Sequence, residues 1–272
     1  MMSEERHPLR LPGTAIVAAA AMLFLYVPII VLVILSFNES DMTTIWTGFS
    51  LNWYAKALGN GTMLVAIGNS LIVAAVATIL ATAAATSAAL GIVRSGRRFR
   101  GAIEGLLGLP LLIPEIVTAV ALLLLFVLAG IKLGLLSVVL AHTVFCIPFA
   151  YYPIRSRLAA LDPALGEAAS DLYAPAWRRF WRIELPLLAP GIFAGALLAF
   201  ISSLGDFVIT YFVAGPGATT LPVYIYGMIR TGITPEVNAL STILLLASVA
   251  VVAIVFRMGT TPANHNRGDQ IP

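Results

Sequence analysis

The sequence predicts an all-α integral membrane protein with six transmembrane helices. Its 272 residues are 60% hydrophobic and only 11% charged, whereas a soluble domain is nearer a quarter charged. Six apolar runs are each long enough for a helix to cross a hydrocarbon core of about 30 Å. Arginine and lysine also gather in alternate connecting segments, which is typical of a multi-pass membrane protein.

The six runs cover approximately residues 14–37, 64–92, 103–130, 134–154, 190–214 and 238–257. Each is expected to be a helix, because backbone polar groups must be paired inside lipid. The first run is too long for the apolar region of a cleaved signal peptide, so we interpret it as a retained span. Pro110 and Pro114 are expected to kink the third span. We expect a single transmembrane domain over residues 1–272.

The basic residues predict the orientation. With the N-terminus in the cytoplasm, only Lys56, Lys132 and Arg230 of the 16 lysines and arginines fall in outside segments. Positive charge favours the cytoplasmic side. Both termini are therefore predicted to be cytoplasmic, and so is the segment between the fourth and fifth spans.

Several single residues have an ordinary structural interpretation. Cys146 is the only cysteine, so it cannot form an intramolecular disulfide, and we expect a small buried hydrophobic side chain. We expect His142 to be a hydrogen-bonded packing residue rather than a ligand. Thr78, Thr82 and Thr86 recur every four residues among alanines, which favours a helix-packing face over a stripe that contacts substrate.

The outer segments contain further candidate elements. Trp46, Trp53 and Tyr54 are aromatic residues suited to the membrane–water interface. Residues 221–233 read as a short amphipathic helix at the outer surface.

Acidic residues within apolar runs are candidates for a functional site. Glu115 lies in the third run and Asp206 in the fifth. Intramembrane acids are energetically costly and commonly face a water-filled path or a helix bundle. Two interpretations stay open: a pathway that attracts cations, or a hydrogen bond between helices. Glu104 lies nearer the cytoplasmic end and is expected to pair with the arginines at 94–100.

The cytoplasmic segment 162–186 predicts two short amphipathic helices. Asp162 and Pro163 form a helix start, and Pro175 starts a second helix. Apolar residues recur at helical spacing in the first: Leu165, Ala168, Ala169 and Leu172. In the second, one face carries Trp177, Phe180 and Trp181, and the other carries Arg178, Arg179 and Arg182. Pro186 and Pro190 are expected to end it. The pair either lies on lipid headgroups or docks a cytoplasmic partner.

The same segment resembles the EAA loop of ABC importer permeases. Glu167-Ala168-Ala169 and the later Ile183-x-Leu185-Pro186 match that family's motif and spacing. Tyr173 stands where the family usually has glycine, and a positive φ is costly for a bulky residue. The turn is therefore made either at this position or by Ala174 and Pro175.

The resemblance extends over about residues 14–257. The stretches "AHTVFCIPFAYYPIRSRL" and "LGDFVITYFVAGPG" look like the polyamine branch, closest to the C-type permeases of spermidine/putrescine importers. This implies the type I importer permease (MetI-like) fold in a bacterial inner membrane. It also implies ATPase coupling through nine residues: Glu167, Ala168, Ala169, Asp171, Leu172, Tyr173, Ile183, Leu185 and Pro186.

The resemblance implies a non-catalytic transport subunit with no cofactor or metal. Its partners would be a cytoplasmic ATPase dimer, a second permease subunit, an external solute-binding protein and membrane lipid, but not nucleic acid. Glu167 and Asp171 would pair with cations on the ATPase, and the three aromatic residues at 177–181 would hold the second helix against the permease. Asp206 and Glu115 would line the substrate pathway.

Three alternatives remain. The same architecture could carry another small solute, such as ferric iron, an opine or an aminophosphonate. The chain could also be a membrane-embedded enzyme with Glu115 and Asp206 as acid and base, or a signalling scaffold. The spans show no nucleophile, metal set or paired base, which disfavours an enzyme.

Overall fold

A computed structural model describes residues 13–41, 45–93, 95–162, 164, 171, 173, 175–231 and 235–259. The regular elements in these ranges are helices, and two backbone segments meet in an isolated bridge between Asn38 and Phe49. The helices in chain order are α1 (Thr14–Leu35), α2 (Asn52–Gly59), α3 (Gly61–Val93), α4 (Arg97–Leu112), α5 (Glu115–Leu128), α6 (Leu135–Ala159), α8 (Ala176–Arg179), η1 (Phe180–Glu184), α9 (Leu185–Gly205), α10 (Val208–Val213), α11 (Leu221–Thr231) and α12 (Pro235–Gly259).

The predicted helical membrane fold is confirmed. Within the described ranges five helices are long and apolar enough to cross a membrane, and the bent pair α4–α5 makes a sixth span if it counts as one. The residues pack as two compact units: one contains residues 1–60 and 228–244, and the other contains 61–227 and 245–272. The larger unit holds both candidate sites.

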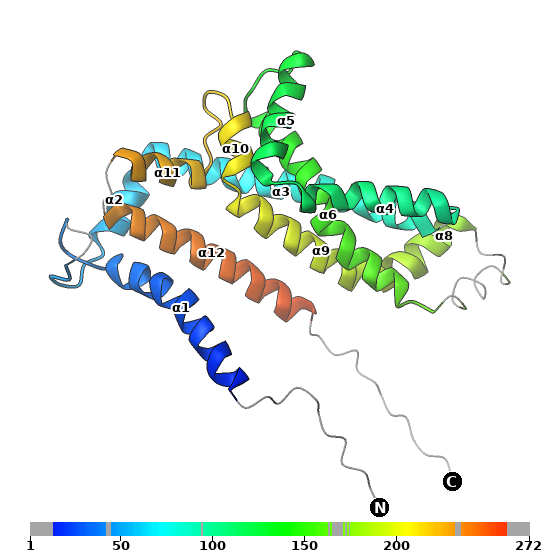
Figure 1. The fold of residues 1–272 in the computed structure, drawn as a ribbon, viewed down its shortest axis with the longest axis horizontal. Helices are drawn as coiled ribbons and strands as arrows, with labels where there is room; N and C mark the ends of the chain where they lie inside the picture. The colour runs from blue at the N-terminus through cyan, green and yellow to red at the C-terminus, as the bar shows by residue number, and fades with distance from the viewer. Residues whose placement is uncertain are drawn as a thin grey trace, which may run out of the picture. The chain divides into compact units, whose positions relative to one another are not determined.

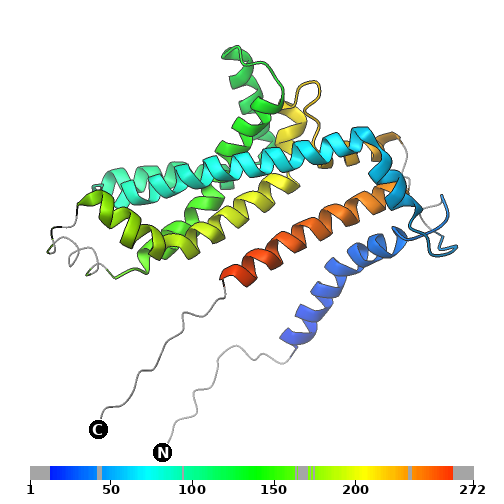
Figure 2. The same ribbon diagram turned by 180° about the vertical axis from the view of Figure 1, so that it is seen from behind.

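Helices α3, α6 and α9 pack side by side in the larger unit (Figures 1 and 2). Small side chains make this close packing possible, because they let helix backbones approach one another. The small residues that these helices contribute to one buried cluster are Ala81, Ala85, Ala89, Cys146, Ala150 and Ala199. Thr78 and Thr82 are also buried, and Thr86 donates to the carbonyl of Thr82. The helix-packing interpretation of this threonine and alanine face is thus confirmed.

The contact between α6 and α9 is closest at Gly195. A methyl group added there would lie 2.5 Å from the Ala150 carbonyl oxygen and 3.1 Å from its Cα. Gly195→Ala is therefore expected to lower the free energy of unfolding by about 1 to 3 kcal/mol, since overpacking forces backbone shifts. Gly91→Ala is the matched control, because nothing lies within 4 Å of its added methyl. Thermal unfolding in detergent measures both, and equal midpoints would contradict the prediction.

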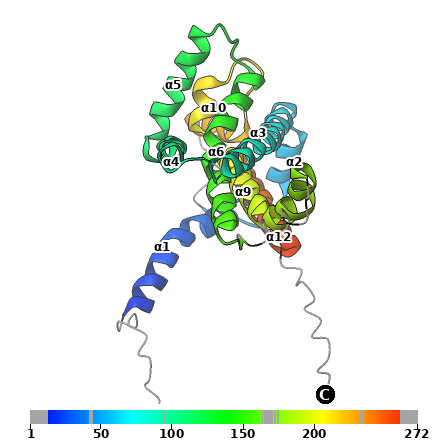
Figure 3. The same cartoon turned by 90° about the vertical axis from the view of Figure 1, so that its right-hand side faces the viewer.

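The third predicted span is two helices rather than one kinked helix. α4 and α5 meet at an angle of 108°, and Figure 3 views α4 nearly end-on with α5 turned away from it. The break falls at Ile113, which is extended with ψ 134°, directly before Pro114. A proline disfavours helical geometry in the preceding residue and lacks an N–H group. Pro110 is instead accommodated inside α4.

The fifth span begins earlier than predicted. α8, the π-helix η1 and α9 form one apolar span over Ala176–Gly205, so Pro186 and Pro190 do not end the preceding helix. Pro186 is the second residue of α9 and follows the π-helix η1 directly. Widened π turns of this kind accommodate irregularities within a continuing helix.

In the smaller unit, hydrogen bonds connect Asn38, which follows α1, with Ile45, Thr47 and Trp53; we call these residues the cap. The Asn38 side chain accepts from the Thr47 N–H at 2.9 Å and donates to the Ile45 carbonyl at 2.7 Å. The Trp53 indole N–H donates to the Asn38 carbonyl at 2.8 Å, and its ring is buried. Trp53 therefore packs inside this cap, and its place at the membrane–water interface stays a prediction. Trp46 is exposed.

Candidate functional site

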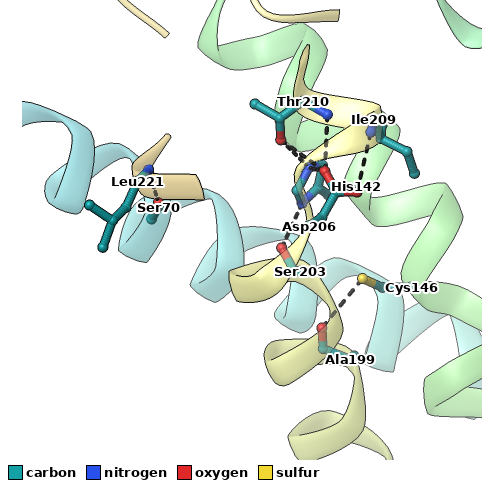
Figure 4. Close-up of polar contacts among 9 residues, drawn as sticks. All are labelled: Ser70, His142, Cys146, Ala199, Ser203, Asp206, Ile209, Thr210 and Leu221. Atoms are coloured by element: carbon teal, nitrogen blue, oxygen red, sulfur yellow. Dashed lines mark hydrogen bonds and ion pairs between the residues drawn. The ribbon is translucent and has the colours of Figure 1, made fainter. Parts of the chain in front are cut away.

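Asp206 lies in a break between two helices and not within a continuous span. α9 ends at Gly205 and α10 begins at Val208, which corrects the predicted uninterrupted span 190–214. The Asp206 carboxylate accepts from the backbone N–H groups of Ile209 and Thr210 at 3.2 and 3.0 Å (Figure 4). It thereby satisfies amides at the start of α10 that have no carbonyl partner, as an N-terminal capping aspartate does.

His142 joins this carboxylate from α6. The imidazole is fully buried, with Nδ1 2.7 Å from the Ser203 hydroxyl and Nε2 2.8 Å from the Thr210 hydroxyl. Nε2 also lies 3.1 Å from the Asp206 carboxylate. The Thr210 hydroxyl donates a hydrogen bond to the Asp206 carboxylate at 3.0 Å. The network therefore assigns Nε2 as the donor and Nδ1 as the acceptor of the Ser203 proton.

The expectation that His142 is a hydrogen-bonded packing residue is confirmed. Sequence reasoning missed that its partner is Asp206. Cys146, one helical turn further along α6, is buried as expected and donates to the Ala199 carbonyl at 3.4 Å.

Glu115 meets Asp206 from a third helix. It is the first residue of α5, directly after the break at Pro114, and its side chain lies close enough to Asp206 for the two acids to interact electrostatically. A helix N-terminus favours an acidic side chain, because unpaired amides point toward it. The two predicted pathway residues thus come together, with Glu115 exposed and Asp206 buried.

Three aromatic rings cluster around Phe207, which follows Asp206 directly in the chain. Phe207 contacts Tyr211 and Tyr226 with centroid distances of 5.3 and 4.5 Å, and the two tyrosines are 5.8 Å apart. Tyr211 and Tyr226 are exposed. Aromatic faces attract organic cations, so this ring cluster is a candidate contact for an ammonium group. No pattern in the sequence predicted that Tyr226 would contact Phe207 and Tyr211.

Hydrogen bonds hold in place the start of α11 (Leu221–Thr231), the helix that contains Tyr226, and the residues just before it. The Ser70 hydroxyl of α3 accepts from the Leu221 N–H at 2.8 Å (Figure 4). The Asn69 amide donates to the carbonyls of Gly217 and Thr219 at 2.9 and 3.0 Å. These bonds hold the start of α11 against α3. α11 also confirms most of the short amphipathic helix expected over 221–233.

The opposite end of the larger unit has an ion-paired cluster. Glu104 accepts from the Arg100 guanidinium at 3.2 Å, as expected, and from that of Arg155 at 3.1 Å. The second contact was not predicted, because Arg155 lies on α6. Glu104 therefore ties α4 to α6.

The predicted coupling loop is described in part. Glu167, Ala168, Ala169 and Leu172 lie outside the described residues. Asp162 accepts from the Ala164 N–H at 2.9 Å, in agreement with the predicted helix start. Asp171 is exposed.

Tyr173 adopts the conformation that glycine would favour. Its φ is 51°, and its side chain is 94% exposed. Among the described residues it is the one position other than glycine with a positive φ. Of the two possible turns, the structure thus places left-handed geometry at Tyr173 itself. An L-residue pays about 1 to 2 kcal/mol for that geometry.

Tyr173→Gly is accordingly expected to stabilise the turn by about 1 kcal/mol, because glycine adopts a positive φ without steric cost. Amide hydrogen exchange of residues 171–176, followed by mass spectrometry, should slow several-fold. Tyr173→Ala is the matched control, since it removes the ring but keeps the strain. Equal protection in the two variants would show that the ring, and not the backbone, determines the effect.

The remaining coupling residues lie at the start of the fifth span. Ile183 is half-buried in η1, while Leu185 and Pro186 begin α9. Trp177 stacks edge-on against Trp181 at 5.2 Å. Their side chains are 72% and 48% exposed. The expectation that these rings hold the helix against the permease does not agree with the structure for Trp177, because most of its side chain is exposed; for Trp181, which is about half covered, it stays a prediction.

Comparison with known proteins gives a consistent result. The family of binding-protein-dependent transport system inner membrane components matches residues 77–260. The chain is 42% identical to the putrescine transport system permease protein PotI of Escherichia coli, over 90% of both chains. It is 41% identical to the spermidine/putrescine transport system permease protein PotC of Haemophilus influenzae, over 89% of this chain and 94% of that one.

Solved structures share the fold. A bacterial ABC transporter involved in alginate import superposes with a TM-score of 0.70 at 16% identity, covering 90% of this chain and 93% of that one. The MetNI methionine ABC transporter gives a TM-score of 0.64 at 17% identity, covering 78% of this chain and 98% of that one.

Proposed function

Since this chain belongs to the family of binding-protein-dependent transport system inner membrane components, we propose that it is the permease subunit of an ABC importer for putrescine and spermidine. The observation that supports these polyamines as the solute is the sequence identity of about 40% to permeases named for them, over about nine tenths of the chain. The alginate and methionine transporters share the fold, so fold alone does not select the solute.

The paired acids support a polyamine as cargo. A polyamine is a flexible chain of methylene groups and ammonium groups. Glu115 and Asp206 supply negative charge where α5 and α10 begin, and Phe207, next to Asp206 in the chain, contacts the exposed rings of Tyr211 and Tyr226. Carboxylates attract ammonium groups, and aromatic faces attract them further. Asp206 and Glu115 are therefore the proposed pathway residues.

Transport would be driven from the cytoplasmic loop at 162–186. An ATPase dimer would bind Glu167, Ala168, Ala169, Asp171 and Leu172, with the turn at Tyr173. Ile183, Leu185 and Pro186 would pass the movement into α9, which is continuous with η1. A rigid helix can transmit such a displacement. The chain itself would catalyse no reaction, because ATP hydrolysis belongs to the ATPase.

The remaining partners follow from the family. A second permease would complete the pathway, and a solute-binding protein would deliver cargo at the outer face. The chain lies in the inner membrane, and we place both termini in the cytoplasm. Thirteen of the 16 lysines and arginines then face inward, which supports this orientation.

ATP hydrolysis by the reconstituted importer tests the function. The chain is co-purified with its ATPase, second permease and binding protein, and is titrated with putrescine, spermidine, ferric iron and an aminophosphonate. Stimulation by the two polyamines alone is the expected result. Stimulation by another solute would retain the permease function and overturn the proposed cargo.

A further inference from the structure

Two exposed tryptophans mark the first turns of the fifth span. Trp177 and Trp181 stack edge-on with centroids 5.2 Å apart, and their side chains are 72% and 48% exposed. Phe180 contacts Trp181 at 5.4 Å. An exposed, ordered pair of large amphipathic rings on a membrane helix suits an environment that is apolar on one side and wet on the other.

Arginines accompany the tryptophans with the same spacing. Trp177 and Trp181 are four residues apart and form one row along the helix, and Arg178 and Arg182, each one residue later, form the adjacent row. Both arginines are exposed. Arg179 differs, because its guanidinium is paired with Glu184 at 3.0 Å. Glu184 thus neutralises one arginine, and residues 176–184 keep a net charge of +2 from three arginines and one glutamate.

The depth of this surface in the membrane follows from the helix that carries it. Ala176–Gly205 is a candidate span of 30 residues, or about 45 Å, which exceeds a hydrocarbon core of about 30 Å. Its charged first turns are therefore expected outside the hydrocarbon, at the level of the headgroups. Tryptophan is enriched at that level, and arginine is attracted there to anionic lipid phosphates. A soluble partner would instead have to cover rings located at the edge of the lipid.

We propose that Trp177, Arg178, Trp181 and Arg182 form a binding surface for the headgroup of an anionic phospholipid in the cytoplasmic leaflet. The arginines contact the phosphate, and the indoles lie at the glycerol level. The choice of leaflet rests on the orientation given under the proposed function. Lipid held at this place would fix the depth of the helix that follows the coupling loop.

Native mass spectrometry of the full-length chain, purified with its partner subunits, tests the surface without substrate or ATP. Phosphatidylglycerol is titrated against phosphatidylcholine. Arg178→Gln/Arg182→Gln is expected to weaken phosphatidylglycerol binding about fivefold for each arginine removed. Arg98→Gln is the matched control, because Arg98 is an exposed arginine at the predicted cytoplasmic end of α4. Equal phosphatidylglycerol binding by the double variant, the control and the wild type would overturn the proposal.

A second measurement needs no altered charge. Brominated phosphatidylglycerol should quench tryptophan fluorescence in vesicles that contain the wild-type importer. Quenching should be weaker in Trp177→Phe/Trp181→Phe, which leaves Trp46 and Trp53 as the background. Equal quenching in both proteins, or full protection of the pair by the bound ATPase, would overturn a lipid contact, the latter by showing a protein in its place.

The two proposals can fail separately. Absence of polyamine stimulation with normal lipid retention would overturn the transport function alone. In Arg178→Cys, labelling of the new thiol from the outer side of intact cells would overturn the assignment of this surface to the cytoplasmic leaflet.

Discussion

Asp206→Asn is expected to lower polyamine transport by the reconstituted importer more than about tenfold, because hydrogen bonds to a charged group contribute about 1.5 to 3 kcal/mol. The carboxylate accepts from Ile209, from both donors of Thr210 and from His142. An asparagine has one acceptor oxygen, and its NH₂ group would face donors. The negative charge beside the aromatic rings would also be lost. Uptake of labelled putrescine into proteoliposomes measures the effect.

Glu115→Gln is the matched control for Asp206→Asn. It makes the same chemical change in the partner acid, whose side chain is exposed, whereas that of Asp206 is buried. We expect a smaller decrease in uptake and little change in thermal unfolding. Wild-type uptake by Asp206→Asn would contradict the pathway assignment. A lower unfolding midpoint with unchanged apparent affinity for putrescine would instead assign Asp206 to the support of α10.

Glu167→Lys is expected to abolish most solute-stimulated ATP hydrolysis and transport. The proposed ATPase surface carries cations opposite Glu167, and placing like charges together at an interface costs several kcal/mol, or more than about a hundredfold in affinity. The loss should appear as fewer polyamine molecules moved per ATP hydrolysed and as weaker co-purification of the ATPase. Both are measured on the same preparation.

The control for this charge reversal is Glu236→Lys. Glu236 lies in the first turn of α12, on the predicted outer side and away from the ATPase. This variant should assemble and transport normally. If Glu167→Lys kept the wild-type ratio of transport to hydrolysis, the docking role of the loop would be wrong.

Local sequence features predicted the helices better than their interruptions. The length of each apolar run was enough to place six spans, because lipid permits little other than a helix there. Pro114 correctly marked the position of the bend in the third span, but not its angle of 108°, which depends on how α5 packs with α10. The break at Asp206 has no proline. It depends on a carboxylate that replaces backbone partners, and such a choice is decided by the surrounding fold.

The contents of the site were predictable by residue type but not by partnership. Acids in apolar runs are conspicuous, so Glu115 and Asp206 could be selected without a structure. Their meeting, and the contact of Asp206 with His142, join three helices that are distant in sequence. The same limit applies to Trp53, because its residue type suits a membrane interface but does not reveal that its indole donates to the Asn38 carbonyl. Periodicity in the sequence describes the face of a single helix, whereas these contacts depend on how separate segments pack together.

The π-helix Phe180–Glu184 has a consequence for insertions and deletions. A π turn contains about one residue more than an α turn, so deleting one residue there could leave a regular α-helix. Because the π turn holds that extra residue within the same full rotation, the deletion would leave the segments on its two sides in nearly their original relative directions. Deleting one residue from the regular α-helical part of α9 would instead rotate everything before it by about 100°, since an α-helix advances by that angle per residue. The π-helix is therefore the part of the fifth span where the chain could lose one residue without turning the coupling loop away from its partner.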